Sequence, residues 1–171
     1  MNLSKNTSIY LTSKDSHNRL EKIKESEISC DSNAELKSIR LHRTHLRQSI
    51  LGFGGAFTEA SASIYDQLDK NKKSEIIEAY FGEIGNQYNM GRTHINSCDF
   101  SLGNYALCET KDRKLADFSI QRDKKMLIPF IKAALKKSSV PIHIMASPWS
   151  PPPWMKTNNQ MNHGGKLKEE Y

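Results

Sequence analysis

Apolar residues recur in short blocks from residue 49 onward, and their spacing predicts alternating strands and helices. Short apolar runs predict three strands, which begin near Ser49, Tyr88 and Pro141. Between them, one-sided apolar spacing predicts a helical stretch from about 60 to 81 and a helix through 126–135. The order strand, helix, strand, helix, strand indicates a parallel sheet with right-handed crossovers. Doubly wound sheets and βα barrels both have this order.

Three residues predict where the helices begin and end. Asp69 is suited to cap a second helical piece, because its carboxylate can accept a backbone N–H of the following turn. Gly82 is typical of a helix end. Pro129 lacks an N–H group and predicts either a late start of the last helix or a kink in it.

The first 47 residues are polar and mixed, and their pattern is weaker. The run from Ile9 to Thr12 is β-branched and aromatic and predicts a strand, and residues 13–16 after it are typical of a turn. The composition changes at Ser49, where the apolar blocks begin. We therefore expect a domain boundary near residue 47.

Composition excludes several classes of protein. The 171 residues suit one domain or a piece of a larger one. No run approaches the roughly 18 apolar residues of a membrane helix, so no membrane span is expected. Residues 1–6 carry no apolar block like that of a secretory signal, which leaves a cytoplasmic location as the default.

The three cysteines form no CxxC pair and no cysteine–histidine metal spacing, which favours a reducing compartment. The glycine-rich stretch 52–55 is neither GxGxxG nor a P-loop, and no cofactor is expected.

The formal net charge of +6 raises the question of nucleic acid binding. Most of the excess lies in residues 111–137, which carry nine basic and three acidic side chains. These basic residues flank a helical apolar pattern, so a solvated helix face is favoured over a nucleic-acid patch. No zinc-finger, helix-turn-helix or RNA-recognition signature accompanies them. A nucleic acid partner is therefore not expected.

Conspicuous side chains gather where the predicted strands end. Glu59 follows the first strand, Arg92 and Asp99 lie on either side of the end of the second, and Trp149 follows the third. In parallel βα folds this edge of the sheet carries the active site. A carboxylate and an amide bind hydroxyls, and an indole face covers the apolar face of a sugar ring. The pattern therefore indicates a sugar site.

Each of these residues also has a purely structural interpretation. A glutamate such as Glu59 is favoured at a helix N-terminus by the helix dipole. Arg92 and Asp99 are suited to a structural ion pair. Trp149 is suited to packing in a core or to anchoring a loop.

Three motifs follow one another along the chain: GFGGAFTEA at 52–60, NSCDFS at 96–101 and ASPWSPPPWMKTN at 146–158. In that order they resemble glycoside hydrolase family 30, which contains the glucosylceramidases and the related β-1,6-glucanases. The resemblance runs unbroken from about Ser49 to Tyr171, whereas residues 1–48 match weakly.

The resemblance implies an α/β fold, the (β/α)8 TIM barrel, with an accessory β-sandwich. Residues 48–171 then correspond to a partial barrel, its first three βα units, and residues 1–47 to strands of the accessory β-domain. The resemblance matches Trp149 to an indole that lines the glycone pocket and Arg92 to an arginine near the nucleophile. It matches Glu59 to an acidic ligand of the glucose hydroxyls, although glucosylceramidases carry Asp there.

The family hydrolyses β-glucosides with retention of configuration and uses two glutamates, an acid/base in an Asn-Glu-Pro motif and a nucleophile on a later strand. No Asn-Glu-Pro motif occurs in the chain, and only three βα-type strands are predicted. We therefore expect the N-terminal part of a retaining β-glucosidase, truncated and inactive by itself. Glucosylceramide and a β-1,6-glucan are both open as substrates. The alternative is a non-catalytic remnant that binds sugar or packs against a partner chain.

Overall fold

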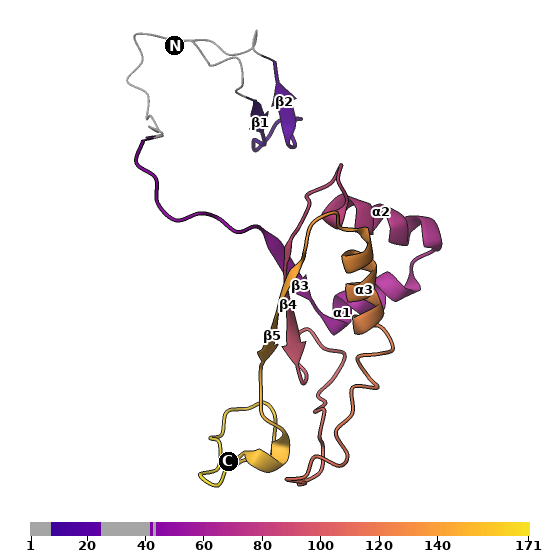
Figure 1. Ribbon diagram of the computed structural model, residues 1–171, viewed down its shortest axis with the longest axis vertical. Coiled ribbons are helices and arrows are strands. Elements are labelled where there is room, and N and C mark those ends of the chain that lie inside the picture. Colours follow the sequence, from indigo (N-terminus) through magenta and orange to yellow (C-terminus); the bar gives the residue numbers. More distant parts are fainter. Residues whose placement is uncertain (1–7, 25–41, 43) are drawn as a thin grey trace. The chain divides into compact units, whose positions relative to one another are not determined.

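The computed structural model describes residues 8–24, 42 and 44–171 (Figure 1). The chain divides into two compact units, Met1–Gln48 and Ser49–Tyr171. In the described part of the chain, no helix has the length and apolar character needed to cross a membrane.

The N-terminal unit contains an antiparallel hairpin. Strand β1 (Ile9–Leu11) pairs with β2 (Glu21–Ile23), and Tyr10 lies opposite Lys22. Strand β1 confirms the strand predicted from the run that begins at Ile9. The sequence Glu-Lys-Ile of β2 has no apolar alternation, so its strand was not predicted. That this hairpin belongs to an accessory β-domain stays a prediction.

The C-terminal unit is built on a three-stranded parallel sheet in the order β3-β4-β5. Its strands are β3 (Gly54–Phe57), β4 (Met90–Ile95) and β5 (His143–Pro148). Helices α1 (Glu59–Gln67) and α2 (Lys70–Phe81) follow β3, and α3 (Leu127–Lys137) precedes β5. A short 3-10 helix, η2, follows the sheet at Pro153–Met155. The predicted alternation of strands and helices around a parallel sheet is thereby confirmed.

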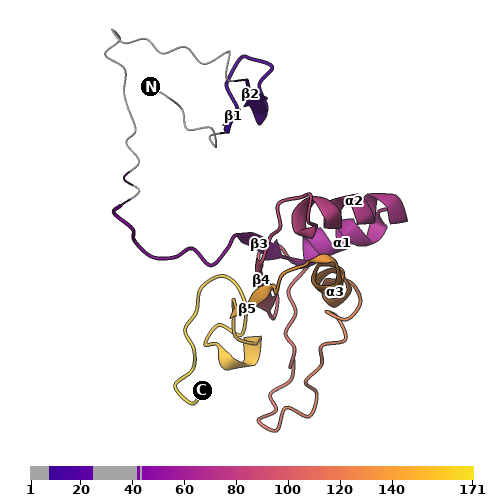
Figure 2. The same ribbon diagram turned by 45° about the horizontal axis from the view of Figure 1, so that its top comes forward.

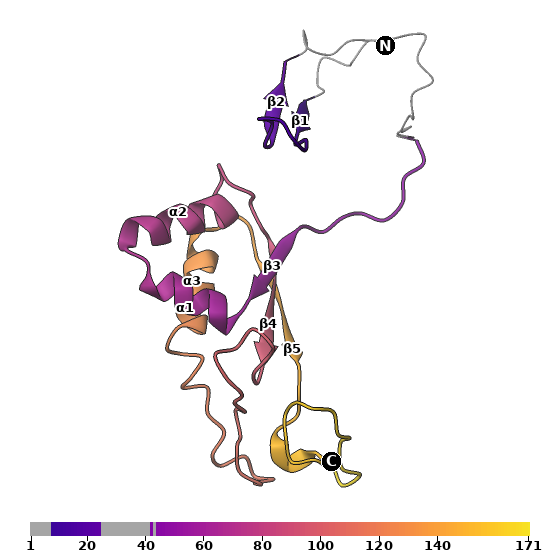
Figure 3. The same cartoon turned by 180° about the vertical axis from the view of Figure 1, so that it is seen from behind.

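All three helices of this unit lie on one side of the sheet (Figures 1, 2 and 3). Between sheet and helices lies an apolar core. The Phe57 ring of β3 stacks on Phe81 at 5.6 Å between centroids and meets Phe130 edge-on at 5.3 Å. Buried Ala62 and Ala134 let the helices approach closely. The core therefore occupies the helix side and leaves the opposite face of the sheet open.

The first strand of the sheet begins later than predicted. Residues Ile50 and Leu51, expected at its start, are 72% and 80% exposed, and the strand runs through the glycines from Gly54. A Cβ atom on Gly54 would lie 1.6 Å from the backbone oxygen of Met90, so only glycine allows β3 to approach β4 this closely. The prediction of a strand from Ser49 was therefore wrong in its bounds.

The helix ends agree with the sequence. The Asp69 carboxylate accepts the N–H groups of Asn71 (2.8 Å) and Lys72 (3.0 Å), and α2 ends before Gly82, as predicted. Helix α3 begins only two residues before Pro129, so the missing N–H group falls in the first turn, where no intrahelical partner is needed. This is the late start that Pro129 predicted.

Candidate functional site

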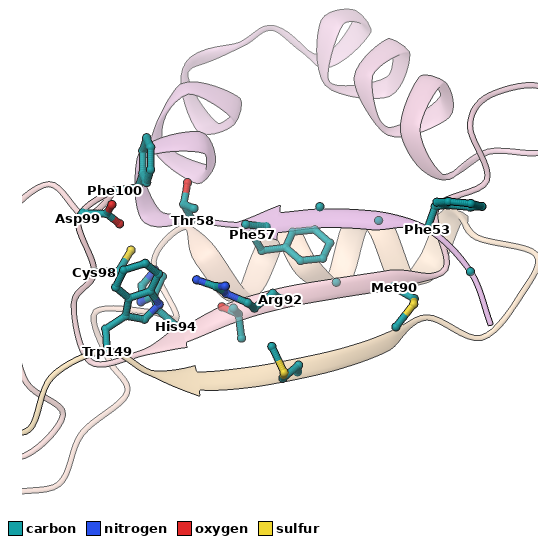
Figure 4. A pocket seen from close by; sticks show the side chains of 17 residues that line it. Phe53, Phe57, Thr58, Met90, Arg92, His94, Cys98, Asp99, Phe100 and Trp149 are labelled. Carbon is teal, nitrogen blue, oxygen red and sulfur yellow. The ribbon is translucent and has the colours of Figure 1, made fainter. Parts of the chain in front are cut away.

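A cavity of about 640 Å³ opens on the face of the sheet that the helices leave free (Figure 4). Side chains alternate across a strand, and a Cβ atom on Gly91 would touch Phe57, so Gly91 faces the core. Its neighbours Met90 and Arg92 therefore face the cavity. In Figure 4 the polar side chains lie toward the end at which the strand arrows point, and Phe53 and Met90 lie at the other end. At the strand ends the lining includes Thr58, His94, Cys98, Asp99 and Trp149.

Two of the predicted site residues meet in this cavity. Arg92 lies in β4 and Trp149 directly after β5, and the guanidinium carbon lies 5.0 Å from the centroid of the indole ring. Trp149 is 46% exposed, so its ring remains accessible while it contacts the cation. A guanidinium over an indole face is a favourable cation–π contact. The pair therefore presents an aromatic surface beside a fixed positive charge.

Asp99, which the sequence places with Arg92 at the end of the second strand, also lines the cavity. Among the described residues, no hydrogen bond or ion pair engages the Asp99 carboxylate, and the ion pair with Arg92 does not form. Asp99 lies in the NSCDFS motif, four residues after the end of β4. Its place in that motif, just after a strand end, is the signal by which the sequence indicated it.

Glu59 occupies a different environment from Arg92 and Trp149. It is the first residue of α1, only 4% exposed, and it is not part of the cavity lining. Its Oε1 atom accepts a hydrogen bond from Nε of Arg122 at 2.7 Å, and its Oε2 atom accepts the backbone N–H of Leu102 at 2.8 Å. The structure thus brings Arg92 and Trp149 together but directs the Glu59 carboxylate to Arg122.

The ionisation of Glu59 follows from these contacts. Burial disfavours the charged carboxylate and by itself raises the pKa of Glu59. The hydrogen bonds from Arg122 and from the Leu102 N–H, with the positive charge of Arg122, outweigh burial and lower the pKa below its ordinary value. Glu59 is therefore held as an anion.

A polar network continues from Arg122 to the end of β4. The Arg122 guanidinium lies 4.2 Å from the centroid of the Tyr105 ring, and the Tyr105 hydroxyl donates to Asp123 at 2.6 Å. Burial and this bond raise the pKa of Tyr105. Buried His94 donates through Nδ1 to the backbone oxygen of Asn96 at 2.7 Å.

Trp154 lies outside the cavity lining. Its Nε1 atom donates to the backbone oxygen of Cys108 at 3.0 Å, and its ring meets Tyr171 edge-on at 5.1 Å. This tryptophan therefore anchors the chain after β5. Within the described ranges, no three histidine, cysteine, aspartate or glutamate side chains gather at a point where they could hold a metal ion.

Comparison with known proteins matches this architecture. Residues 50–171 match the glycosyl hydrolase family 30 TIM-barrel domain. Lysosomal acid glucosylceramidase of Mus musculus is 42% identical over 123 residues, which cover 71% of this chain and 24% of that protein. The crystal structure of SrfJ from Salmonella typhimurium is 44% identical with a TM-score of 0.70, and the match covers 74% of this chain and 28% of that one. The endo-β1,6-glucanase BT3312 is 26% identical with a TM-score of 0.66, over 77% of this chain and 30% of that one.

The chain spans about a quarter of the length of the curated relatives it matches. Within that span the match is continuous from residue 50 to residue 171 and includes all three motifs and the whole parallel sheet. The chain therefore belongs to glycosyl hydrolase family 30.

Proposed function

We propose that the protein is a retaining β-glucosidase and that residues 48–171 supply the part of a TIM barrel formed by its first three βα units. The observation that carries the proposal is the convergence of Arg92, Asp99 and Trp149 on one open cavity at the carboxyl ends of parallel strands. This is the edge at which TIM-barrel enzymes bind their substrates. Residues 1–47 are assigned to the accessory β-domain on the strength of the family resemblance.

Each of the three side chains has a role suited to a glucose ring. The exposed indole of Trp149 covers the apolar C–H face of the sugar. The Asp99 carboxylate, which no described residue engages, accepts hydrogen bonds from sugar hydroxyls. Arg92 lies beside both, and its fixed charge favours the ionised form of a nearby carboxylate nucleophile. We assign no direct contact with a sugar hydroxyl to Glu59, because Arg122 and Leu102 engage its carboxylate.

Retaining hydrolysis needs two carboxyl groups on opposite sides of the anomeric carbon, about 5–5.5 Å apart. Among the described residues that line the cavity, Asp99 is the one with an acidic side chain. Residues 1–171 by themselves are therefore expected not to hydrolyse a β-glucoside. The nucleophile and the acid/base come from other parts of a family barrel.

Two of the matched proteins are named for substrates that contain glucose and that differ in what is attached to it. One is a glucosylceramidase and the other an endo-β1,6-glucanase. A site that contacts the glucose ring through Trp149 and Asp99 is compatible with both. We therefore propose the β-glucosyl group as the recognised part of the substrate, either as glucosylceramide or as a β-1,6-glucan.

The test uses the protein as its gene encodes it. Hydrolysis of 4-methylumbelliferyl β-D-glucopyranoside is compared with that of the α-glucoside, and early proton NMR spectra of the sugar product report its anomeric configuration. We expect turnover of the β-anomer alone, with retention, and a loss in kcat on the order of a hundredfold in Arg92→Ala. Lys132→Ala on the exposed side of α3 is the matched control. Binding of methyl β-D-glucoside without turnover would instead indicate a sugar-binding remnant.

A further inference from the structure

We propose that Glu59 is a positioning residue, which holds residues 98–102 against α1 so that Asp99 and Phe100 face the cavity. The inference rests on the proposed function, because it assigns Glu59 to the same glucoside site. It gives Glu59 a part in substrate binding that acts through other side chains.

Two hydrogen bonds join the start of α1 to this short segment. The Glu59 carboxylate accepts the N–H of Leu102 at 2.8 Å, and the N–H of the next residue, Ala60, donates to the backbone oxygen of Phe100 at 3.0 Å. The bonded residues lie directly beside Asp99 and Phe100, which both line the cavity. The start of α1 therefore determines how far these two side chains reach into the cavity.

The opposite end of the same loop is closed by two hydrogen bonds between Ser97 and Tyr105. The N–H of Ser97 donates to the backbone oxygen of Tyr105 at 3.0 Å, and the N–H of Tyr105 donates to the Ser97 hydroxyl at 3.1 Å. Leu102 lies in the loop between these two residues. Its N–H donates to the Glu59 carboxylate, which is how a side chain at the start of α1 contacts the loop. Because the Ser97–Tyr105 hydrogen bonds fix the two ends of the loop, its orientation toward the cavity depends on the contact with Glu59.

Both oxygens of Glu59 are already engaged. Nε of Arg122 donates to Oε1, and the second guanidinium nitrogen donates to Oε2 at 3.2 Å, the same atom that accepts the Leu102 N–H. Arg122 is itself packed over the Tyr105 ring at the base of the loop. With only 4% of its surface exposed, Glu59 is built into the support of the site and does not face the sugar.

The first test variant is Glu59→Gln, which keeps the size of the side chain and changes only its charge and its hydrogen bonds. Its amide has one oxygen, so an NH2 group must face either Arg122 or the Leu102 N–H, and one of the two contacts is lost. The matched control is Glu78→Gln, which removes a different ion pair, that between α2 and Lys137 of α3. Glu78 does not line the cavity. Glu59→Asp, which keeps the charge and shortens the reach, is the second variant if Glu59→Gln fails to fold.

The first readout is a double-mutant cycle on hydrolysis of 4-methylumbelliferyl β-D-glucopyranoside by the protein as its gene encodes it. Glu59→Gln is expected to lower kcat/KM about tenfold, as for the loss of a hydrogen bond to a charged group. In the Asp99→Asn background the same change is expected to cost less than about twofold, because coupled residues are not additive. Equal losses in both backgrounds would overturn the proposal, since a general structural defect does not depend on Asp99.

The second readout needs no glycoside and is amide hydrogen exchange at Leu102. In Glu59→Gln the Leu102 amide is expected to exchange at least about tenfold faster than in the unsubstituted protein, with no change in Glu78→Gln. An unchanged Leu102 rate, or an equal rise in both variants, overturns the positioning role. If the unsubstituted protein neither binds nor hydrolyses the glucoside, the proposed function fails, and Leu102 exchange alone then decides whether Glu59 holds the loop.

Discussion

The guanidinium carbon of Arg92 lies 5.0 Å from the ring centroid of Trp149, which joins the middle of β4 to the first residue after β5. Strands β4 and β5 pair in parallel along their whole lengths, so the two side chains meet because of the register of the sheet. The contact orients the indole without burying it. A sugar ring stacked on Trp149 therefore also lies close to the charge of Arg92.

Trp149 and Trp154 are expected to affect different properties. Trp149→Ala removes the aromatic surface of the cavity, and a loss of about tenfold in kcat/KM for an aryl β-glucoside is expected, with a higher KM and a lower kcat. Trp154→Ala removes the hydrogen bond to the Cys108 oxygen and the contact with Tyr171. Trp154→Ala is therefore expected mainly to lower the melting temperature of the protein. Equal losses of kcat/KM in the two variants, at unchanged stability, would contradict this prediction.

Two adjacent glycines form a matched pair for testing how β3 meets β4. In Gly54→Ala the new methyl group would lie 1.6 Å from the Met90 oxygen, so the strands must separate, at a cost of about 2–3 kcal/mol in the free energy of unfolding. In Gly55→Ala no atom lies within 4 Å of the new methyl group, and stability is expected to change by less than about 1 kcal/mol. Urea unfolding of both variants provides the measurement. A loss at Gly55 as large as that at Gly54 would show that the close approach does not decide the pairing.

Acid is expected to weaken the fold partly through Glu59. Its pKa in the folded protein lies below the value of 4.5 for a free glutamate, so its ionised form stabilises the fold above about pH 4.5. That contribution is lost as the pH falls from 4.5 through the folded pKa. The free energy of unfolding should therefore fall less between pH 7 and pH 3.5 in Glu59→Gln than in the unsubstituted protein. Asp117 and Glu170, whose pKa values are also lowered, contribute to the acid loss in both proteins. Parallel pH profiles would argue against the prediction.

The thiol of Cys108 is expected to react slowly with alkylating agents. Its hydrogen bond to the Asp117 carboxylate, at 2.8 Å, together with burial, raises the pKa of Cys108 to about 11. Since the thiolate is the reactive form, little of it is present at pH 8. Asp117→Asn removes the negative charge and should speed alkylation by iodoacetamide about tenfold for each unit by which the pKa falls. Peptide mapping by mass spectrometry, with Cys98 in the same sample as the internal reference, measures the rate. An unchanged rate in Asp117→Asn would rule out the carboxylate as the cause.

The features that could be predicted from the sequence depend on neighbours along the chain. Helix α2 begins at Asp69 because a carboxylate there accepts N–H groups two and three residues later, and it ends at Gly82. The alternation of strands and helices follows from apolar spacing, and three contiguous motifs identify the family. Each of these features depends on residues that lie close together in the chain, so it can be predicted from the sequence.

The features that only the tertiary structure decided join residues far apart in the chain. The start of β3 at Gly54 depends on the backbone of Met90, which lies on another strand. Glu59 has the same local sequence whether it faces a sugar or a protein side chain, and its partner Arg122 comes from the segment before α3. Local hydrogen bonds are encoded by spacing, whereas the direction of a buried charge depends on which opposite charge the fold places beside it.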